Sequence, residues 1–196
     1  MNQENKTTTA EEVKATKPKR TRKKTPKKSE FETCMDHVFE NEGILSDDPV
    51  DRGGLTKYGV TISTYKKYWK DKGEEKTEDD LRKATKAEVL EIYRKNFWEP
   101  SRVEQLPKEI RMTYFDMVVN HGQGNAVRIL QKAINLGRIS LISEDGLIGK
   151  NTISHAKKVS RDKLQASRAL FYANLIARRP QQEKFWLGWY RRCKNT

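Results

Sequence analysis

Aromatic residues occupy only part of this chain, and their position sets the limits of any folded unit. All 17 Phe, Trp and Tyr residues lie at or after Phe31. Residues 1–29 hold ten Lys or Arg against three Glu, and their only larger apolar side chains are Met1 and Val13. Such a segment cannot bury enough apolar surface to offset the conformational entropy lost on ordering. We therefore expect a disordered basic arm over residues 1–30, followed by a folded part.

From Phe31 onward the apolar residues recur mostly with a helical period. Phe31, Met35, Val38 and Phe39 follow one another at i, i+4, i+7 and i+8, which is one face of a helix that Gly43 would stop. Residues 44–61 break this pattern with Pro and Gly and favour a short β-like loop or hairpin. The fold class is therefore mainly α, a helical bundle with one small β-like excursion. Further helices are expected from Ser63 to Lys70, Thr85 to Phe97, Pro107 to Gly122, Ala126 to Leu136, Asn151 or Thr152 onward, Lys163 to Arg178, and around Phe185, Trp186 and Trp189.

One acidic residue interrupts the apolar face of the first helix. Glu42 lies eleven positions after Phe31, about three turns at 3.6 residues per turn, and so falls near the middle of the apolar stripe. A carboxylate there is either exposed because the helix ends at it, or held at the edge of the core for a function. The pattern alone leaves both interpretations open.

More acidic residues follow Glu42 around a glycine-rich turn: Asp47, Asp48 and Asp51, and then Thr56. Cleavage of a glycosidic bond needs a proton donor and a second group that stabilises or intercepts the oxocarbenium-like transition state. A partly desolvated Glu has a raised pKa and suits the first role, and an Asp on a facing loop suits the second. On spacing alone, however, helix caps and solvated loop groups explain these residues more simply.

A longer motif adds to this cluster. Residues 42–61 read EGILSDDPVDRGGLTKYGVT, which resembles the signature of glycoside hydrolase family 108, approximately E-G-G-Y-x-x-D-P-x-D-x-G-G-x-T-x-x-G-I-T. Later segments are also similar to blocks of that family and of the predicted peptidoglycan-binding region that completes its members: Phe97-Trp98, Phe115-Asp116, Asn120-x-Gly122, Leu130-Gln131, Asp145-Gly146 and Phe185-x-x-Gly188-Trp189-x-x-Arg192. The resemblance covers residues 31 to 193 and omits the basic arm.

The resemblance implies a lysozyme-like α+β fold and a muramidase of phage or bacterial type. It implies three parts: the arm over 1–30, a catalytic region over 31–120, and a peptidoglycan-binding helical region over 121–193 packed on it. The chain departs from the signature at Ile44 and Leu45, where a Gly and an aromatic are usual. A β-branched residue does not easily take the positive φ that Gly allows, so the turn after Glu42 is expected to differ in shape.

The resemblance also assigns roles to individual residues. It makes Glu42 the catalytic acid. By analogy with phage-type lysozymes, Asp51 or Thr56 would position a water molecule or stabilise the positive charge on the sugar. Substrate contacts are expected from Asp48, Tyr58, Trp98, Asn120 and His121. Structural alternatives stay open for the last group, because aromatics at helical spacing are more often core, a His near a helix end is often a cap, and Asp48 before a Pro can hold a loop.

The implied reaction is cleavage of the β-1,4 bond between N-acetylmuramic acid and N-acetylglucosamine in peptidoglycan. A lytic transglycosylase and a non-catalytic peptidoglycan- or nucleic-acid-binding virion protein are the alternatives. The stereochemistry, inverting or retaining, is left open because it depends on the separation of the carboxylates.

The sequence predicts no cofactor and no metal site. It has no HExxH, CxxC, P-loop or GxGxxG pattern, and Cys34 and Cys193 make no disulfide framework. We expect a monomer whose partner is the glycan strand of peptidoglycan. The basic arm would bind an anionic partner, either the cell wall or DNA, or would serve only to keep the protein soluble.

No apolar stretch is long enough for a membrane span, and the lysine-rich start has no apolar segment typical of a signal peptide. The expectation is synthesis in the cytoplasm and action on the wall, as an endolysin, a virion-associated lysozyme or a secretion-linked muramidase.

Overall fold

The computed structural model of the protein describes residues 28–41, 45–46 and 54–196. In chain order the elements are α1 (Glu30–Asn41), β1 (Leu45–Ser46), β2 (Thr56–Lys57), β3 (Val60–Thr61), α2 (Ile62–Asp71), α3 (Glu78–Lys83), α4 (Lys86–Tyr93), the π-helix η1 (Arg94–Trp98), the 3-10 helix η2 (Val103–Gln105), α5 (Lys108–His121), α6 (Gln123–Asn135), α7 (Lys150–Ala156), α8 (Arg161–Arg178), the 3-10 helix η3 (Pro180–Phe185) and α9 (Trp186–Asn195). The mainly helical fold class with a small β excursion is confirmed.

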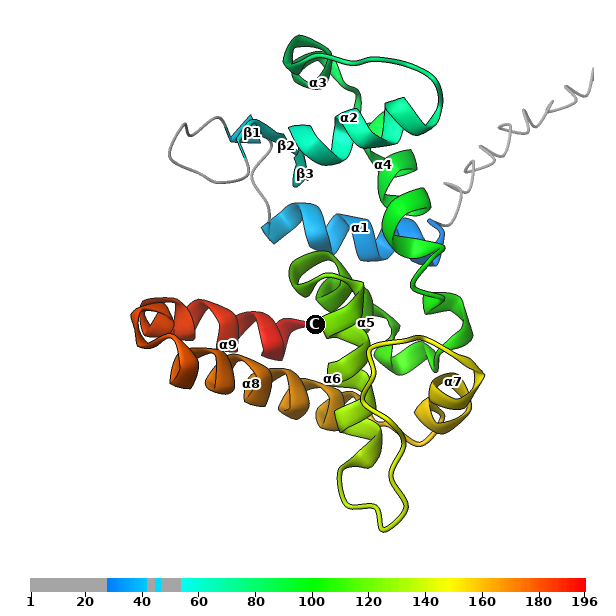
Figure 1. Ribbon diagram of the computed structural model, residues 1–196, viewed down its shortest axis with the longest axis vertical. Coiled ribbons are helices and arrows are strands. Elements are labelled where there is room, and N and C mark those ends of the chain that lie inside the picture. Colours follow the sequence, from blue (N-terminus) through cyan, green and yellow to red (C-terminus); the bar gives the residue numbers. More distant parts are fainter. Residues whose placement is uncertain (1–27, 42–44, 47–53) are drawn as a thin grey trace, which may run out of the picture.

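The elements form two ends joined by a central layer. In Figure 1 the small sheet, α2 and α3 lie at one end, α6 to α9 lie at the other, and α1 and α5 lie between them. None of the described helices has the length and apolar character needed to cross a membrane.

Helix α1 forms where the apolar period predicts it. Ser29 and Glu32 cap its start reciprocally, since the Glu32 backbone N–H donates to the Ser29 hydroxyl and the Ser29 backbone N–H donates to the Glu32 carboxylate. Phe31, Met35 and Val38 are buried. The helix therefore buries the predicted face, and its last described residue directly precedes Glu42.

The β excursion is a three-stranded antiparallel sheet in the order β1-β2-β3. Ser46 pairs with Thr56, and Thr56 pairs with Thr61 on its other side. The pairing brings together the two ends of the segment that carries Asp48 and Asp51, which lie outside the described residues.

Helix α2 begins earlier than the sequence predicts. Thr61, not Ser63, is its N-cap, because the Thr61 hydroxyl accepts the backbone N–H of Thr64 at 3.3 Å. The Ser63 hydroxyl lies 2.9 Å from that of Thr61 instead. Both residues are acceptable caps by type, and the end of β3 decides between them.

Of the next two helices, α3 was not expected and α4 begins where the sequence predicts it. Helix α3 is not predicted, because its six residues bury only Leu81 and show no apolar period. Thr85 caps α4 as predicted and accepts the N–H of Glu88. The Glu88 carboxylate accepts from the Tyr65 hydroxyl at 2.6 Å and the Trp69 indole at 3.1 Å, so its described bonds lead to α2.

The remaining helices occur at the predicted places with shifted ends. Helix α5 follows Pro107, and Gly122 separates it from α6, which starts at Gln123 and not at Ala126. Helix α8 starts at Arg161 because Ser160 caps it, whereas Lys163 was the expected start.

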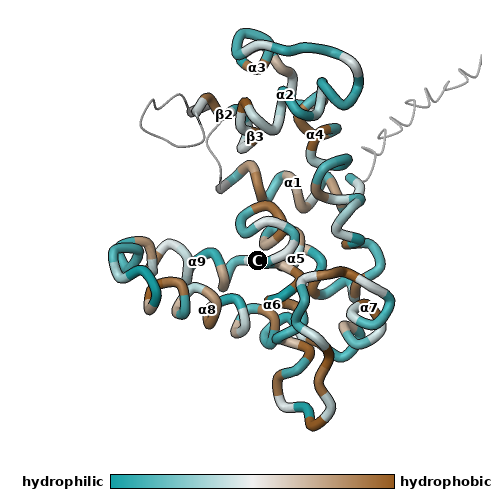
Figure 2. Tube along the Cα trace, in the orientation of Figure 1, coloured by the Kyte–Doolittle hydropathy of each residue, from teal (hydrophilic) through white to brown (hydrophobic). Residues whose placement is uncertain are grey.

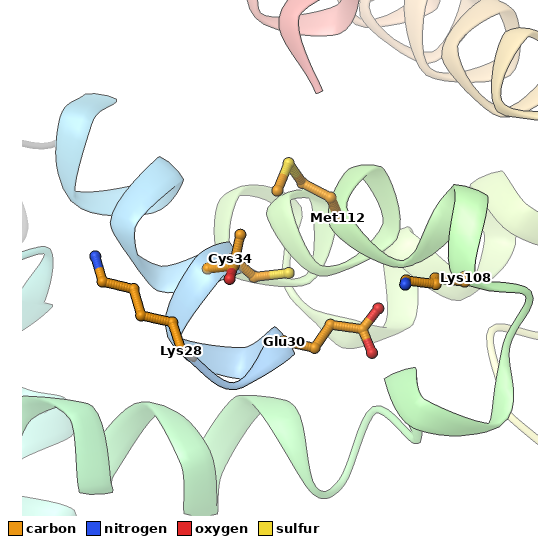
Figure 3. A pocket seen from close by; sticks show the side chains of 6 residues that line it. Lys28, Glu30, Cys34, Lys108 and Met112 are labelled. Carbon is orange, nitrogen blue, oxygen red and sulfur yellow. The ribbon is translucent and has the colours of Figure 1, made fainter. Parts of the chain in front are cut away.

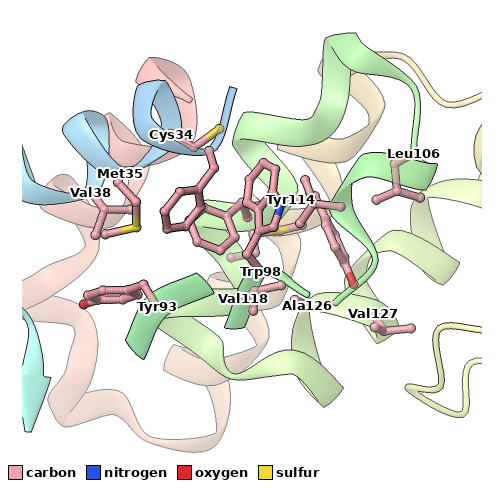
Figure 4. Packing of buried hydrophobic residues seen from close by; sticks show 14 of the residues in the cluster. Cys34, Met35, Val38, Tyr93, Trp98, Leu106, Tyr114, Val118, Ala126 and Val127 are labelled. Atoms are coloured by element: carbon pink, nitrogen blue, oxygen red, sulfur yellow. The ribbon is translucent and has the colours of Figure 1, made fainter. Parts of the chain in front are cut away.

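The core lies where α1, η1 and α5 meet. Figure 4 shows Trp98 among the buried residues of this core. Its ring centroid lies 5.3 Å from that of Phe31 and 4.9 Å from that of Phe115. Figure 2 shows an apolar tip on the loop between α6 and α7, where Ile139 and Leu141 are exposed. The main core thus joins the first helix to the middle of the chain.

Candidate functional site

Three of the sequence-predicted site residues lie outside the described part of the chain: Glu42, Asp48 and Asp51. The described segments on either side are the end of α1, strand β1 and the residues from Gly54 onward. These described segments frame the candidate site.

Thr56 lies on the middle strand of the sheet, half-buried. Its hydroxyl donates to the carbonyl oxygen of Gly54 at 3.2 Å. Because the hydroxyl hydrogen is used in this bond, the Thr56 oxygen still has lone pairs that can accept a hydrogen bond from a water or a sugar hydroxyl. Ser46 across the strand pair fixes the position of this residue.

Tyr58 forms the turn between β2 and β3 in an uncommon backbone conformation. Its φ is 48°, and Gly59 follows with φ 76°; a left-handed conformation is costly for a residue with a Cβ. The Tyr93 hydroxyl donates to the Tyr58 carbonyl at 3.2 Å, and the Tyr58 ring lies 5.5 Å from that of Phe39. Tyr58 is thus held beside the last part of α1, which leads to Glu42.

Trp98 borders a cavity of about 290 Å³ beside Arg94 and Glu99, but its ring is almost fully buried, which argues against the expected stacking on a sugar. It is 2% exposed, and its indole N–H donates to the Glu104 carboxylate at 3.1 Å. The ring packs between Phe31 and Phe115 in the core. These contacts favour the alternative that the sequence left open, a core aromatic residue.

Asn120 and His121 end α5, and only Asn120 is exposed. The Asn120 amide donates to the Asp116 carbonyl of its own helix at 2.8 Å. His121 accepts a hydrogen bond from the Arg168 guanidinium at 3.2 Å and contacts the rings of Phe171 and Tyr172, each at 5.0 Å. His121 is therefore part of a helix-packing contact in this structure.

A buried charge cluster lies behind His121. The Asp116 carboxylate is 2.6 Å from the Arg168 guanidinium and 2.9 Å from that of Arg192, and both Asp116 and Arg168 are fully buried. Arg168 also donates to the Thr196 hydroxyl at 3.3 Å. The cluster joins α5, α8 and α9, which are far apart in sequence.

Charge and burial together set the pKa values in this cluster. Burial alone would raise the pKa of Asp116, but the hydrogen bonds from Arg192 and the charge of Arg168 hold it below its usual value. Burial, followed by the charge of Arg168, lowers the pKa of His121 to about 3. His121 is therefore neutral at physiological pH, as its acceptor role requires.

Arg168 was not among the site residues expected from the sequence. The available signal was its place on the buried face of α8, at i+4 from Leu164 and i−4 from Tyr172. An arginine at such a position needs a buried carboxylate, and Asp116 among the buried residues of α5 was the candidate.

A cavity of about 500 Å³ opens at the N-terminal part of α1 (Figure 3). It is lined by Lys28, Glu30, Thr33, Cys34, Lys108 and Met112. The Glu30 carboxylate is paired with Arg111 at 2.6 Å. A 12-residue helix is about 18 Å long, so this cavity lies at the opposite end of α1 from Asn41 and away from the chemistry expected of Glu42.

Among the described residues, no group of three His, Cys, Asp or Glu side chains is arranged to hold a metal ion. Burial raises the pKa of the Cys34 thiol to about 12 and also raises that of Cys193. Both thiols are thus protonated at neutral pH and are poor nucleophiles or ligands.

Comparison with known families identifies the two parts of the chain. Residues 35–122 match the family model of glycosyl hydrolase 108, and residues 125–194 match that of a predicted peptidoglycan domain. We call these two matched parts the glycosyl hydrolase 108 region and the peptidoglycan domain. The glycosyl hydrolase 108 region holds the second part of α1, the sheet and the helices from α2 to α5, whereas the peptidoglycan domain holds most of α6 and the helices from α7 to α9.

A solved structure supports the same relationship. The chain is similar to Brucella abortus SagA, with 27% sequence identity and a TM-score of 0.68 over 84% of this chain and 90% of that one. Comparison with curated proteins gives no significant match. The family matches support a glycoside hydrolase that acts on peptidoglycan, with peptidoglycan as its partner.

The buried charge cluster crosses between these two family regions. Asp116 and His121 belong to the glycosyl hydrolase 108 region, and Arg168 and Arg192 belong to the peptidoglycan domain. The helices that carry them therefore pack through a charged core contact.

Proposed function

We propose that this chain is a muramidase that hydrolyses the β-1,4 bond between N-acetylmuramic acid and N-acetylglucosamine in peptidoglycan. Glu42 is the general acid that protonates the leaving oxygen. The observation that carries the proposal is the match of residues 35–122 to glycosyl hydrolase 108, because Glu42 begins the acidic, glycine-rich motif within that range. We keep the three-part division into an arm (1–30), a catalytic region (31–120) and a peptidoglycan-binding region (121–193) as part of the proposal.

The chemistry of the neighbouring residues supports this role for Glu42. Apolar side chains of α1, Val38 and Phe39, precede it in the chain, and an apolar surrounding raises the pKa of a carboxyl group. A general acid needs such a raised pKa to be protonated at working pH. The tyrosine turn at Tyr58 packs on Phe39 from the sheet side.

Asp51 and Thr56 are proposed to serve the other half of the reaction. An ionised Asp51 stabilises the positive charge that develops on the sugar or activates the attacking water. The Thr56 hydroxyl, whose proton is directed to Gly54, accepts a hydrogen bond from that water. Asp48, Tyr58 and Asn120 remain proposed substrate contacts. His121 is proposed to act indirectly, because its contacts with α8 hold the end of α5 that carries Asn120.

Digestion of purified peptidoglycan by wild type and Glu42→Gln tests the assignment. Loss of a general acid should lower the rate by about a hundredfold or more, whereas Asp51→Asn and Thr56→Val separate the two candidates for the second role. Glu40→Gln is the matched control, since Glu40 is an exposed carboxylate two residues earlier, on α1. Equal loss in Glu40→Gln and Glu42→Gln would contradict a specific role for Glu42.

Mass spectrometry of the released fragments separates the proposal from its alternatives. Reducing muramic ends are expected from a muramidase, and anhydro ends would show a lytic transglycosylase. If wild type binds the wall and releases no fragment, the chain is a binding protein and the enzyme proposal fails.

We further propose that the chain acts in the periplasm or outside the cell, as an endolysin, a virion-associated lysozyme or a secretion-linked muramidase. The basic residues 1–29 are proposed to hold an anionic partner, either the wall or DNA. Binding of duplex DNA that falls steeply with salt and disappears on deletion of residues 1–29 would favour DNA. Unchanged binding of both partners after the deletion would remove the arm from the proposal.

A further inference from the structure

A hollow of about 280 Å³ lies between helices α6 and α8 of the peptidoglycan domain, which run close together in Figure 1. Its lining residues come from both helices: Asn125, Arg128, Ile129, Lys132, Phe171, Asn174, Leu175 and Arg178. The volume is near the lower end of the range for small-ligand pockets, about 300–1,000 Å³. We call this hollow the α6–α8 groove.

The charge of the α6–α8 groove is one-sided. Arg128, Lys132 and Arg178 contribute three cations, and the lining includes no carboxylate. Lys132 and Arg178 are exposed, and within the described residues their side chains form no ion pair. Arg128 donates one hydrogen bond to the Asp145 carbonyl and its charge also acts on the Asp145 carboxylate, so Lys132 and Arg178 supply the positive charge that is available to a ligand. The groove is therefore suited to an anionic ligand.

The rest of the lining is amide and apolar. Asn125 and Asn174 are exposed amides that can both donate and accept hydrogen bonds. Phe171, Leu175 and the buried Ile129 supply apolar surface, and the Phe171 ring is fixed against His121 with centroids 5.0 Å apart. Cations alone would favour any polyanion, whereas amides and an apolar floor favour a ligand with amide groups and small apolar side chains.

We propose that the α6–α8 groove binds the peptide stem of peptidoglycan. The free carboxylates of the stem meet Lys132 and Arg178, its amide groups meet Asn125 and Asn174, and its alanine methyl groups lie on Phe171 and Leu175. This inference rests on the proposed action on peptidoglycan and adds the part of the polymer that is recognised. The glycan strand is then left to the glycosyl hydrolase 108 region.

The test is the affinity of the full chain for a soluble disaccharide-tetrapeptide from peptidoglycan, measured by calorimetry. The double charge reversal Lys132→Glu with Arg178→Glu should weaken binding at least about tenfold. Lys66→Glu with Lys67→Glu is the matched control, because it makes the same charge change at exposed positions of α2, at the other end of the molecule. The control should change the affinity by less than about threefold.

Two further probes define the ligand. The peptide-free disaccharide should bind the groove variant and wild type equally, and amidation of the stem carboxylates should weaken binding to wild type but not to the charge-reversed variant. A second variant, Asn174→Leu, keeps the charge and should also weaken binding of the tetrapeptide form. If the groove variants bind it as wild type does, or lose only duplex DNA binding, the inference is overturned.

Digestion of whole peptidoglycan, run in parallel, distinguishes this failure from failure of the proposed function. If wild type cuts peptidoglycan and the groove variants bind the stem normally, the proposed function stands and the proposed role of the groove fails. A wild type that neither cuts peptidoglycan nor binds the disaccharide-tetrapeptide removes both.

Discussion

The carboxylate of Asp116 on α5 and the guanidinium of Arg168 on α8 lie 2.6 Å apart, with exposures of 1% and 0% for the two side chains. They belong to the two family regions of the chain, so this ion pair joins the glycosyl hydrolase 108 region to the peptidoglycan domain. Burying charges is costly unless they are paired and hydrogen-bonded, and Arg192 and His121 complete the pairing. The two regions are therefore expected to unfold together.

Removal of the Asp116 charge should destabilise the whole chain. Asp116→Asn leaves the buried Arg168 guanidinium without its counter-charge, and breaking a buried pair from one side costs about 3–5 kcal/mol. The free energy of unfolding from urea titration measures the effect. Because the pair joins both regions, fluorescence and far-UV signals should shift to the same lower midpoint.

An exposed pair supplies the control for Asp116→Asn. Lys95 and Glu99 form an i,i+4 pair at 3.0 Å on the surface, and such pairs contribute less than about 1 kcal/mol. Glu99→Gln should therefore barely change the midpoint. Equal effects of Glu99→Gln and Asp116→Asn would contradict the assigned role of the buried cluster.

Stability should fall with acidity because of His121. Its pKa is about 3 in the folded chain and about 6.5 in the unfolded chain, so below pH 6.5 the unfolded state binds a proton that the folded state does not. The stability is fully present above pH 6.5 and is lost as the pH falls from 6.5 toward 3, by at most about 1.4 kcal/mol per pH unit. Urea titrations at pH 7, 6 and 5 measure it.

The variant His121→Gln isolates this contribution. Gln keeps an acceptor for the Arg168 N–H but cannot take the proton, so its stability should depend less on pH between 7 and 5. Parallel curves for wild type and His121→Gln over that range would show that other groups cause the pH dependence.

The period of apolar residues was sufficient to predict most of the helices but not their ends. Phe31, Met35 and Val38 mark α1 correctly because a helix of 12 residues repeats its buried face several times. Helix α3 has only six residues and one buried side chain, so it shows no repeat of apolar positions and was not predicted. The choice of Thr61 over Ser63 as the cap of α2 depends on where β3 ends, which is a tertiary fact.

The candidate site was less accessible to prediction. Trp98 has the same sequence pattern as a groove aromatic and a core aromatic, and only its neighbours Phe31 and Phe115 decide for the core. A substrate contact was expected of His121 from the family resemblance, whereas its observed partner Arg168 lies 47 residues later and the pairing depends on how α5 meets α8. The periodic pattern indicates that Arg168 is buried, but only the packing of the helices decides which residues it meets.

The Cys34 thiol should react slowly in the folded chain. Its pKa is raised to about 12 from 9.0 by burial, so at pH 8 its thiolate fraction is about a thousandfold lower than that of an ordinary cysteine. The Cys193→Ser variant, treated with an aromatic disulfide reagent, measures the rate for Cys34 alone. Cys34 also lines the cavity beside α1, through which a reagent could approach. A rate in native buffer equal to the rate in urea would contradict the burial of this thiol.

Gly146 should tolerate no side chain, because two separate costs coincide there. Its φ is 80°, and a Cβ would lie 2.8 Å from the Gly124 carbonyl oxygen and 3.0 Å from the Arg128 guanidinium carbon. Gly137 also has a positive φ, 75°, but has no atom within 4 Å of that position. Gly137→Ala should thus cost only the backbone strain, about 1–2 kcal/mol, and Gly146→Ala should cost clearly more.

The difference between these two variants reports on the α6–α8 groove as well. Relief of the clash at Gly146 requires Arg128 or the backbone of Gly124 to move, and Arg128 lines the groove. Gly146→Ala should therefore weaken binding of the disaccharide-tetrapeptide, whereas Gly137→Ala should leave it unchanged. Equal unfolding midpoints for the two variants would show that the turn at Asp145 yields to the extra methyl group, and Arg128 would then keep its place in the groove.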